Sequence, residues 1–213
     1  MRRLSPALKK EFFSLPNILT YVRIGAIPII IFFLMLSEKA LSGKDSQGLC
    51  FLAFLLFFLA AITDYLDGYI ARQYHMQTLV GKFVDPVADK MIVLATLVTL
   101  VELHRVEAWI VVLIVLREMS INGLRTLATA EGLTIDVIST GKYKTMFQLT
   151  GISLCIIHYE YALPWLSDPV DFNLTGKTFI IFSLFFSFLS AGSYFRKFIH
   201  AITAKYDEME KSK

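Results

Sequence analysis

The chain of 213 residues has little cysteine and little charge. Its two cysteines, Cys50 and Cys155, stand in apolar runs without a second cysteine or a histidine at metal-ligand spacing, which indicates neither a disulfide scaffold nor a zinc site. Charged residues make up 18% of the chain, whereas soluble domains carry about 25%. This composition excludes disorder, a coiled coil and a collagen-like chain. The net charge of +3 is too small to indicate nucleic acid as a partner.

Long apolar segments are what the chain has instead. Hydrophobic residues make up 55% of it, and six stretches approach the length that a bilayer core requires of a helix. These stretches are 17–37, 46–63, 83–103, 108–130, 145–163 and 178–195. The sequence therefore predicts an all-α membrane protein with six transmembrane helices. No A-x-A-like cleavage site follows the first stretch, so we expect it to remain as a span.

Three regions follow from this map. We expect a cytoplasmic juxtamembrane segment at 1–16, a six-helix domain at 17–200 and a charged cytoplasmic tail at 201–213. In the first region apolar residues such as Phe12 alternate with charged ones such as Lys9, a pattern typical of a short amphipathic helix on the membrane surface. A disordered basic tail is the alternative.

The distribution of positive charge predicts the orientation. With six spans both termini lie on one side, and thirteen of the 21 Lys and Arg residues fall on that side. Four fall on the opposite side and four within the spans. Because cytoplasmic loops carry the excess of Lys and Arg, we expect both termini in the cytoplasm.

Four aspartates stand where the second and third spans meet the cytoplasm. Asp64 and Asp67 are three residues apart, and Asp85 and Asp89 are four apart, so each pair lies on one face of a helix. A charged residue at the centre of a spanning helix costs about 2.5–3.5 kcal/mol on the insertion scale. A bound cation offsets this cost and the mutual repulsion, and carboxylate oxygens are the ligands that Mg²⁺ or Mn²⁺ prefers. Helix capping is the alternative, and Pro86 makes it suitable for Asp85 alone.

Small residues and one arginine accompany the first aspartate pair. Gly68 and Ala71 leave room for a ligand to approach the backbone closely, and Arg72 is placed to hold an anionic group such as a phosphate. The alternative for each residue alone is tight helix packing, with Arg72 as a cytoplasmic anchor.

The complete spacing from Asp64 to Asp89 is Asp-x₂-Asp-Gly-x₂-Ala-Arg-x₈-Gly-x₃-Asp-x₃-Asp. It resembles, without a departure, the signature of the CDP-alcohol phosphotransferase family. The resemblance implies six transmembrane helices, a homodimer and a site that opens to the cytoplasm. It also implies the reaction, in which a phosphatidyl or related group passes from a CDP-linked donor to an alcohol with release of CMP.

The resemblance also implies roles for individual residues. The four aspartates would bind Mg²⁺ (or Mn²⁺), and Asp89 would also be the general base that takes the proton of the acceptor hydroxyl. The residues that it implies for binding CDP-diacylglycerol are Asn17, Thr20, Gly68, Ala71, Arg72, Thr78 and Gly81.

Three less specific motifs indicate which alcohol is the acceptor. Residues 15–23, 116–125 and 141–148 resemble segments of the bacterial phosphatidylglycerophosphate synthases, which implies a bacterial cytoplasmic (inner) membrane and glycerol 3-phosphate as the acceptor. Cations that could converge beside the aspartates suit such a dianion. They are Arg117, Arg125, Lys142 and Lys144.

Several alternatives stay open at this point. Arg117 could pair with Glu118 instead, and Lys142 and Lys144 could be topology anchors. Within the family, a phosphatidylinositol-phosphate synthase or a cardiolipin synthase would also take a phosphate-bearing acceptor. Outside it, a cation carrier could use intramembrane aspartates, but it would not need Gly68, Ala71 and Arg72 at these offsets.

Overall fold

The computed structural model describes residues 15–40, 43–73, 79–133, 140–162 and 168–211. Within these ranges the side chains of 15–16, 64–73, 79–86, 140, 208 and 211 are not described. The helices are α2 (Leu15–Glu38), α3 (Gly43–Gln73), α4 (Leu79–Glu102), α5 (Ala108–Ala130), α6 (Thr140–Ile157) and α7 (Phe172–Lys211). Between α6 and α7 stands a short antiparallel hairpin of β1 (Glu160–Tyr161) and β2 (Val170–Asp171), in which Glu160 faces Asp171.

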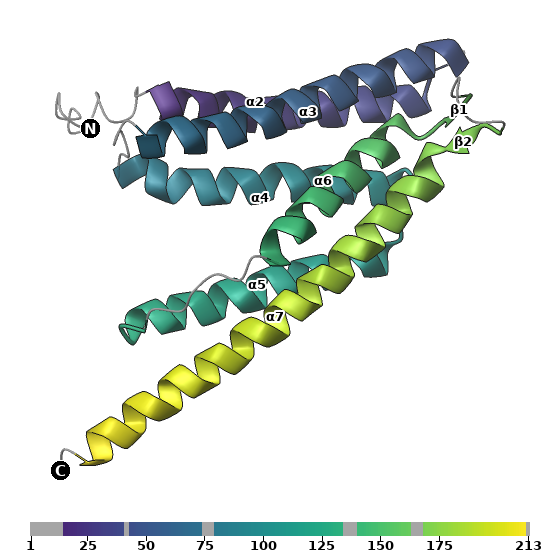
Figure 1. The fold of residues 1–213 in the computed structure, drawn as a ribbon. Helices are drawn as coiled ribbons and strands as arrows, with labels where there is room; N and C mark the ends of the chain where they lie inside the picture. Colours follow the sequence, from purple (N-terminus) through teal and green to yellow (C-terminus); the bar gives the residue numbers. More distant parts are fainter. Residues whose placement is uncertain (1–14, 41–42, 74–78, 134–139, 163–167, 212–213) are drawn as a thin grey trace.

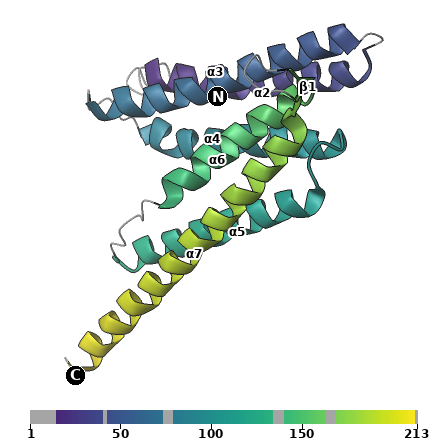
Figure 2. The same cartoon turned by 45° about the vertical axis from the view of Figure 1, so that its right-hand side comes forward.

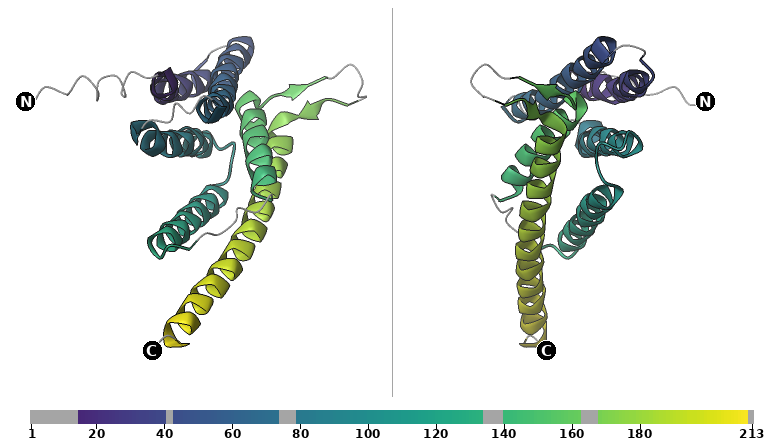
Figure 3. Two further views of the ribbon diagram at one scale, coloured as in Figure 1. Left: turned by 60° about the vertical axis from the view of Figure 1, so that its left-hand side comes forward. Right: turned by 90° about the vertical axis from the view of Figure 1, so that its right-hand side faces the viewer.

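The helices form two groups, one of α2, α3 and α4 and one of α5, α6 and α7 (Figure 1). α3 and α4 both pack against α2, and α6 packs along α7, with α5 against the other part of α7. Figure 2 shows α7 as the longest rod, extending past the other helices toward the C-terminus. Seen from the side, α2, α3 and α4 gather at one end of the molecule and α5 lies apart from α2 and α3 (Figure 3).

The six predicted apolar stretches lie on helices, so their helical structure is confirmed, although α4 ends at Glu102, α6 ends at Ile157, and Glu160–Tyr161 form β1. Three helices of the described chain are long and apolar enough to cross a membrane: α2 from Asn17, α3 as far as Thr63, and α7 as far as Asp207. The protein is therefore a mostly helical membrane protein. The count of six spans stays a prediction, and the expected amphipathic segment lies almost wholly outside the described residues.

Two features depart from the sequence map. The first is the β1–β2 hairpin, which an all-α prediction did not include. The second is the length of α7, which begins before residue 178 and continues far beyond 195. Its start is capped by Asp171, whose Oδ1 accepts hydrogen bonds from the backbone N–H of Asn173 (2.8 Å) and Leu174 (3.0 Å). Near the end of α7, Lys205 Nζ donates a hydrogen bond to Oε2 of Glu131 at 2.8 Å. Glu131 is the residue that follows α5.

Apolar side chains from all six helices form one core. They include Ile30, Leu34, Phe57, Leu97, Ile110, Ile114, Ile152, Ile180 and Leu184. Large apolar side chains also cover the outside of the helices, where Phe32, Phe58 and Phe185 are about half exposed. Such an exterior is unfavourable in water over this extent, and it fits helices surrounded by lipid.

Two glycines bring α6 and α7 into backbone contact. A Cβ atom added at Gly176 would lie 2.8 Å from Gly151 O and 2.7 Å from Cys155 Sγ, so neither helix tolerates a side chain there. Farther along the same contact, Phe147 stacks on Phe186 with ring centroids 5.4 Å apart. Close approach through small residues is a common way for helices to associate in membranes. The contact fixes the position of α6 against α7.

A buried arginine joins the helix ends remote from the aspartates. Arg105 is 2% exposed; its Nη1 donates to Ile156 O at 3.0 Å and its Nη2 to Ser37 Oγ at 3.4 Å. Both acceptors belong to last turns, of α6 and α2, where the helix dipole is negative and favours a cation. The guanidinium also lies 3.4 Å from Cys50 Sγ of α3. Arg105 therefore ties three helices together.

Candidate active site

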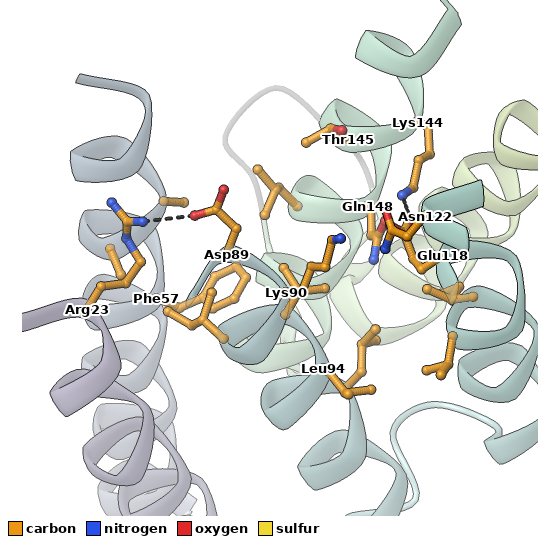
Figure 4. A pocket seen from close by; sticks show the side chains of 18 of the residues that line it. Arg23, Phe57, Asp89, Lys90, Leu94, Glu118, Asn122, Lys144, Thr145 and Gln148 are labelled. Carbon is orange, nitrogen blue, oxygen red and sulfur yellow. Dashed lines mark hydrogen bonds and ion pairs between the residues drawn. The ribbon is translucent and has the colours of Figure 1, made fainter. Parts of the chain in front are cut away.

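A cavity of about 380 Å³ lies between α2, α3, α4, α5 and α6 (Figure 4). Its walls are mostly apolar, formed by residues such as Phe57 and Leu97. The polar lining residues come from four helices and comprise Arg23, Asp89, Lys90, Glu118, Asn122, Lys144, Thr145 and Gln148. A mostly apolar pocket with a few convergent polar groups is typical of a small-molecule site.

On one side of the cavity an arginine holds Asp89. Arg23 Nη1 donates to Asp89 Oδ1 at 2.8 Å, and the arginine side chain is 2% exposed while the aspartate is 43% exposed. Arg23 follows Asn17 and Thr20 at three-residue spacing on α2, and all three are buried. This spacing places them on the face of α2 that meets the neighbouring helices. The carboxylate of Asp89 therefore has a defined position at the cavity.

On the other side an ion-pair cluster joins α5 to α6 and α7. Glu118 Oε1 forms an ion pair with Lys144 Nζ and accepts a hydrogen bond from Arg117 Nη1 at 3.3 Å. Arg117 Nε also donates to Ser187 O of α7 at 3.0 Å. The alternative interpretation that Arg117 pairs with Glu118 is therefore what the structure shows. A guanidinium buried among helices needs such partners.

The other predicted acceptor cations lie away from the cavity. Arg125 lies over the ring of Tyr194 on α7, with its Cζ 5.9 Å from the ring centroid, which is a cation–π contact. Lys142 is exposed and does not line the cavity. Of the four predicted cations, Lys144 alone lines the cavity. The helical period explains the division, because Arg117 and Arg125 share the face of α5 toward α7, whereas Glu118 faces the cavity.

The aspartate motif lies on the two helices that the sequence predicted. Asp64 and Asp67 belong to α3, together with Gly68, Ala71 and Arg72, and Asp85 and Asp89 belong to α4, together with Gly81. Of these residues, only Asp89 has a described side chain, and Thr78 lies outside the described residues. Asp89 presents a partly exposed carboxylate to the cavity, which is the donor type that Mg²⁺ prefers. The metal and donor sites stay predictions.

Sequence reasoning gave no role to five of the polar lining residues. They are Arg23, Lys90, Asn122, Thr145 and Gln148. The sequence held a signal for two of them, since Arg23 and Lys90 are charges inside apolar stretches, and such charges usually face a site or a partner. Asn122, Thr145 and Gln148 are uncharged. Thr145 and Gln148 belong to the segment 141–148 that resembles the synthases, but their residue types alone indicate no role.

Comparison with known proteins assigns the sequence to a family. Residues 13–189 match the family described as CDP-alcohol phosphatidyltransferase. A Bacillus subtilis protein named CDP-diacylglycerol–glycerol-3-phosphate 3-phosphatidyltransferase is 34% identical over 189 residues, which cover 87% of this chain and 95% of that protein. A Rickettsia bellii protein of the same name is 32% identical over 86% of this chain and 94% of its own length.

A relative with a different name is also similar. A rice (Oryza sativa) protein named cardiolipin synthase (CMP-forming) is 32% identical over 168 residues, which cover 72% of this chain and 49% of that protein. Relatives with different names are therefore similar to this chain over most of its length. The family match spans most of the chain and contains the complete aspartate motif and the residues that line the cavity. The chain belongs to the CDP-alcohol phosphatidyltransferase family.

Proposed function

We propose that the protein transfers the phosphatidyl group of CDP-diacylglycerol to glycerol 3-phosphate, giving phosphatidylglycerophosphate and CMP. The names of its relatives at 32–34% identity over most of the chain support this acceptor. The observation that carries the proposal is the cavity itself, which is lined by the carboxylate of Asp89, by Lys90 and, on the opposite wall, by Lys144. A base and a cationic wall are what a phosphate-bearing alcohol requires.

A divalent ion fits the donor set. Asp64, Asp67, Asp85 and Asp89 would hold Mg²⁺ or Mn²⁺, and the bound ion would neutralise the diphosphate and stabilise the CMP leaving group. Carboxylates three and four residues apart on α3 and α4 can project from one side of each helix.

The protein's own groups would position the reactants and move the proton. Asp89 takes the proton of the acceptor hydroxyl while the acceptor oxygen forms a bond to the phosphatidyl phosphorus and the bond to the CMP oxygen breaks. Arg23 keeps the Asp89 carboxylate in place through its 2.8 Å hydrogen bond. Lys144, held by Glu118, contributes positive charge for the acceptor phosphate.

The donor would lie on the other side of Asp89. Gly68, Ala71 and Gly81 leave space for the CDP group, and Arg72 and Thr78 supply groups for its phosphates. Asn17 and Thr20 lie on α2 on the same buried face as Arg23, so they belong to the same end of the site. The site would open to the cytoplasm of a bacterial cell with both termini on that side, and two chains would form a homodimer.

A panel of alcohols tests the proposal. Purified protein is given CDP-diacylglycerol with Mg²⁺ and, in turn, glycerol 3-phosphate, phosphatidylglycerol, inositol phosphate and glycerol, and CMP release is measured. We expect rapid CMP release with glycerol 3-phosphate. Release with phosphatidylglycerol or inositol phosphate alone would assign the chain to a cardiolipin or phosphatidylinositol-phosphate synthase. The absence of CMP release with every alcohol would favour a cation carrier.

A further inference from the structure

Lys90 lines the cavity but takes part in none of the ion pairs formed by the other lining residues. Arg23 pairs with Asp89, and Lys144 pairs with Glu118. Lys90 has no ion pair with any side chain that the structure describes. It is exposed, and its side chain extends into the cavity between α4 and the α5–α6 wall (Figure 4). An ammonium group held in such a cavity attracts an anion.

The position of Lys90 on α4 relates it directly to Asp89. Consecutive residues of a helix have Cα atoms about 3.8 Å apart and side chains about 100° apart around the axis. Asp89 accordingly points toward Arg23 of α2, and Lys90 points toward α5 and α6 (Figure 4). A ligand that reaches both residues must carry its anionic group only a few bonds from its hydroxyl group.

The wall opposite Lys90 adds groups suited to the same ligand. Gln148 is buried, with 5% of its surface exposed, and Asn122 lines the cavity near it. Their amides can donate to phosphate oxygens or exchange hydrogen bonds with a hydroxyl group. Lys144 shares the Glu118 carboxylate with Arg117, so a dianion that enters the cavity meets Lys144 within an ion pair and Lys90 as a lysine outside the ion pairs of the lining.

We propose that Lys90 binds the phosphate of the acceptor and selects small phosphate esters whose hydroxyl group then reaches Asp89. This inference rests on the proposed function, and it adds a specificity-determining residue to that site. Glycerol 3-phosphate meets the geometric requirement, because three carbons link its phosphate to the hydroxyl group at its other end. In the proposed function the donor diphosphate is held with the divalent ion by the four aspartates, and Lys90 has no part in its binding.

The test compares charge-removing and charge-keeping variants. Lys90→Gln and Lys90→Met remove the charge, Lys90→Arg keeps it, and Lys44→Gln removes an exposed lysine near the start of α3, at the far end of the bundle. For each protein we would measure KM for glycerol 3-phosphate, KM for CDP-diacylglycerol, and the equilibrium binding of radiolabelled glycerol 3-phosphate without donor. Because Lys90 is exposed, the variants should fold, and the thermal unfolding midpoint in detergent checks this.

We expect Lys90→Gln and Lys90→Met to raise both KM and Kd for glycerol 3-phosphate about 10-fold or more, since a charge-assisted hydrogen bond to phosphate is lost. KM for CDP-diacylglycerol should stay within about twofold, and the Arg variant and the Lys44 control should resemble wild type. Unchanged acceptor binding, or a loss confined to the donor, would overturn the proposal. A wild-type protein without acceptor-dependent CMP release would instead refute the proposed function. If one charge-removing variant fails to fold, the other variant and the binding measurement decide.

Discussion

The substitution Gly176→Ala should separate α6 from α7 and disturb the site from a distance. The added Cβ would meet Cys155 Sγ at 2.7 Å, the Cys155 backbone nitrogen at 2.8 Å and Gly151 O at 2.8 Å. Ordinary contact begins at 3.4 Å, and two of the three atoms belong to backbone, so a side-chain rotation cannot relieve the overlap. The helices must therefore move apart by roughly half an ångström or more.

The energetic cost follows from that movement. A gap of about 0.5–1 Å removes a quarter to a half of the dispersion attraction between the atoms that it separates. α6 and α7 share a long contact that includes the Phe147–Phe186 stack, so many atom pairs are affected. We expect Gly176→Ala to lower the free energy of unfolding by about 1–3 kcal/mol, which is typical of overpacking. Soluble proteins of this length lose about 2–4 °C of Tm for each kcal/mol.

The effect should also reach the cavity. Gln148 lies one turn before Gly151 on α6, and Lys144 one turn before that, so a displaced α6 moves both side chains. We expect KM for glycerol 3-phosphate to rise in Gly176→Ala while KM for CDP-diacylglycerol changes less. The measurement is thermal unfolding in detergent followed by circular dichroism, together with CMP release.

A matched control lies on the same helix. Gly192 has no atom within 4 Å of an added Cβ, so Gly192→Ala should be neutral or slightly stabilising through its better helix propensity. If Gly176→Ala unfolds at the same temperature as Gly192→Ala, the two helices do not pack through their backbones and the reasoning is refuted.

Three further predictions concern the chemistry. Activity should vanish with EDTA and return with Mg²⁺ or Mn²⁺, and Asp67→Asn should abolish CMP release because a neutral amide cannot balance the cation; full turnover in metal-free protein would exclude this assignment. Asp89→Asn should lower kcat by about 10²–10⁴ with little change in donor affinity, because an amide cannot accept the hydroxyl proton; weakened donor binding with intact kcat would make Asp89 mainly a metal ligand. Lys144→Ala should raise KM for glycerol 3-phosphate by about 10- to 150-fold, and a defect only in membrane insertion would show it to be a topology anchor.

The helices and the aspartate motif could be predicted from the sequence because both depend on local order along the chain. An apolar stretch is helical in lipid whatever its neighbours are, since the backbone must satisfy its own hydrogen bonds there. The spacing of Asp64 and Asp67 likewise stays three residues in any context. The length of α7 could not be predicted from hydropathy, because its last turns are polar and pack against the end of α5 through contacts such as Lys205 with Glu131.

The sequence could not predict which neighbouring helix each polar side chain faces. Arg117 and Arg125 are eight residues apart, which places them on nearly the same face of α5, but the sequence does not say which neighbour that face meets. The structure shows that the neighbour is α7, where Ser187 and Tyr194 engage the two guanidinium groups. The sequence alone does not indicate a role for Lys90, because the motif that contains its neighbour Asp89 does not include the lysine.

The continuous α7 helix is suited to the attachment of a rigid fusion partner for imaging. Forty residues at about 1.5 Å each give a rod of about 60 Å, twice the thickness of a hydrocarbon core. The turns that follow residue 195 therefore have length to stand clear of the bilayer, and Lys205 braces them against the residue that follows α5. A chain of 24.2 kDa is small for single-particle imaging. A rigid partner fused in helical register to the end of α7 would report the orientation of the whole bundle, whereas a flexible fusion would not.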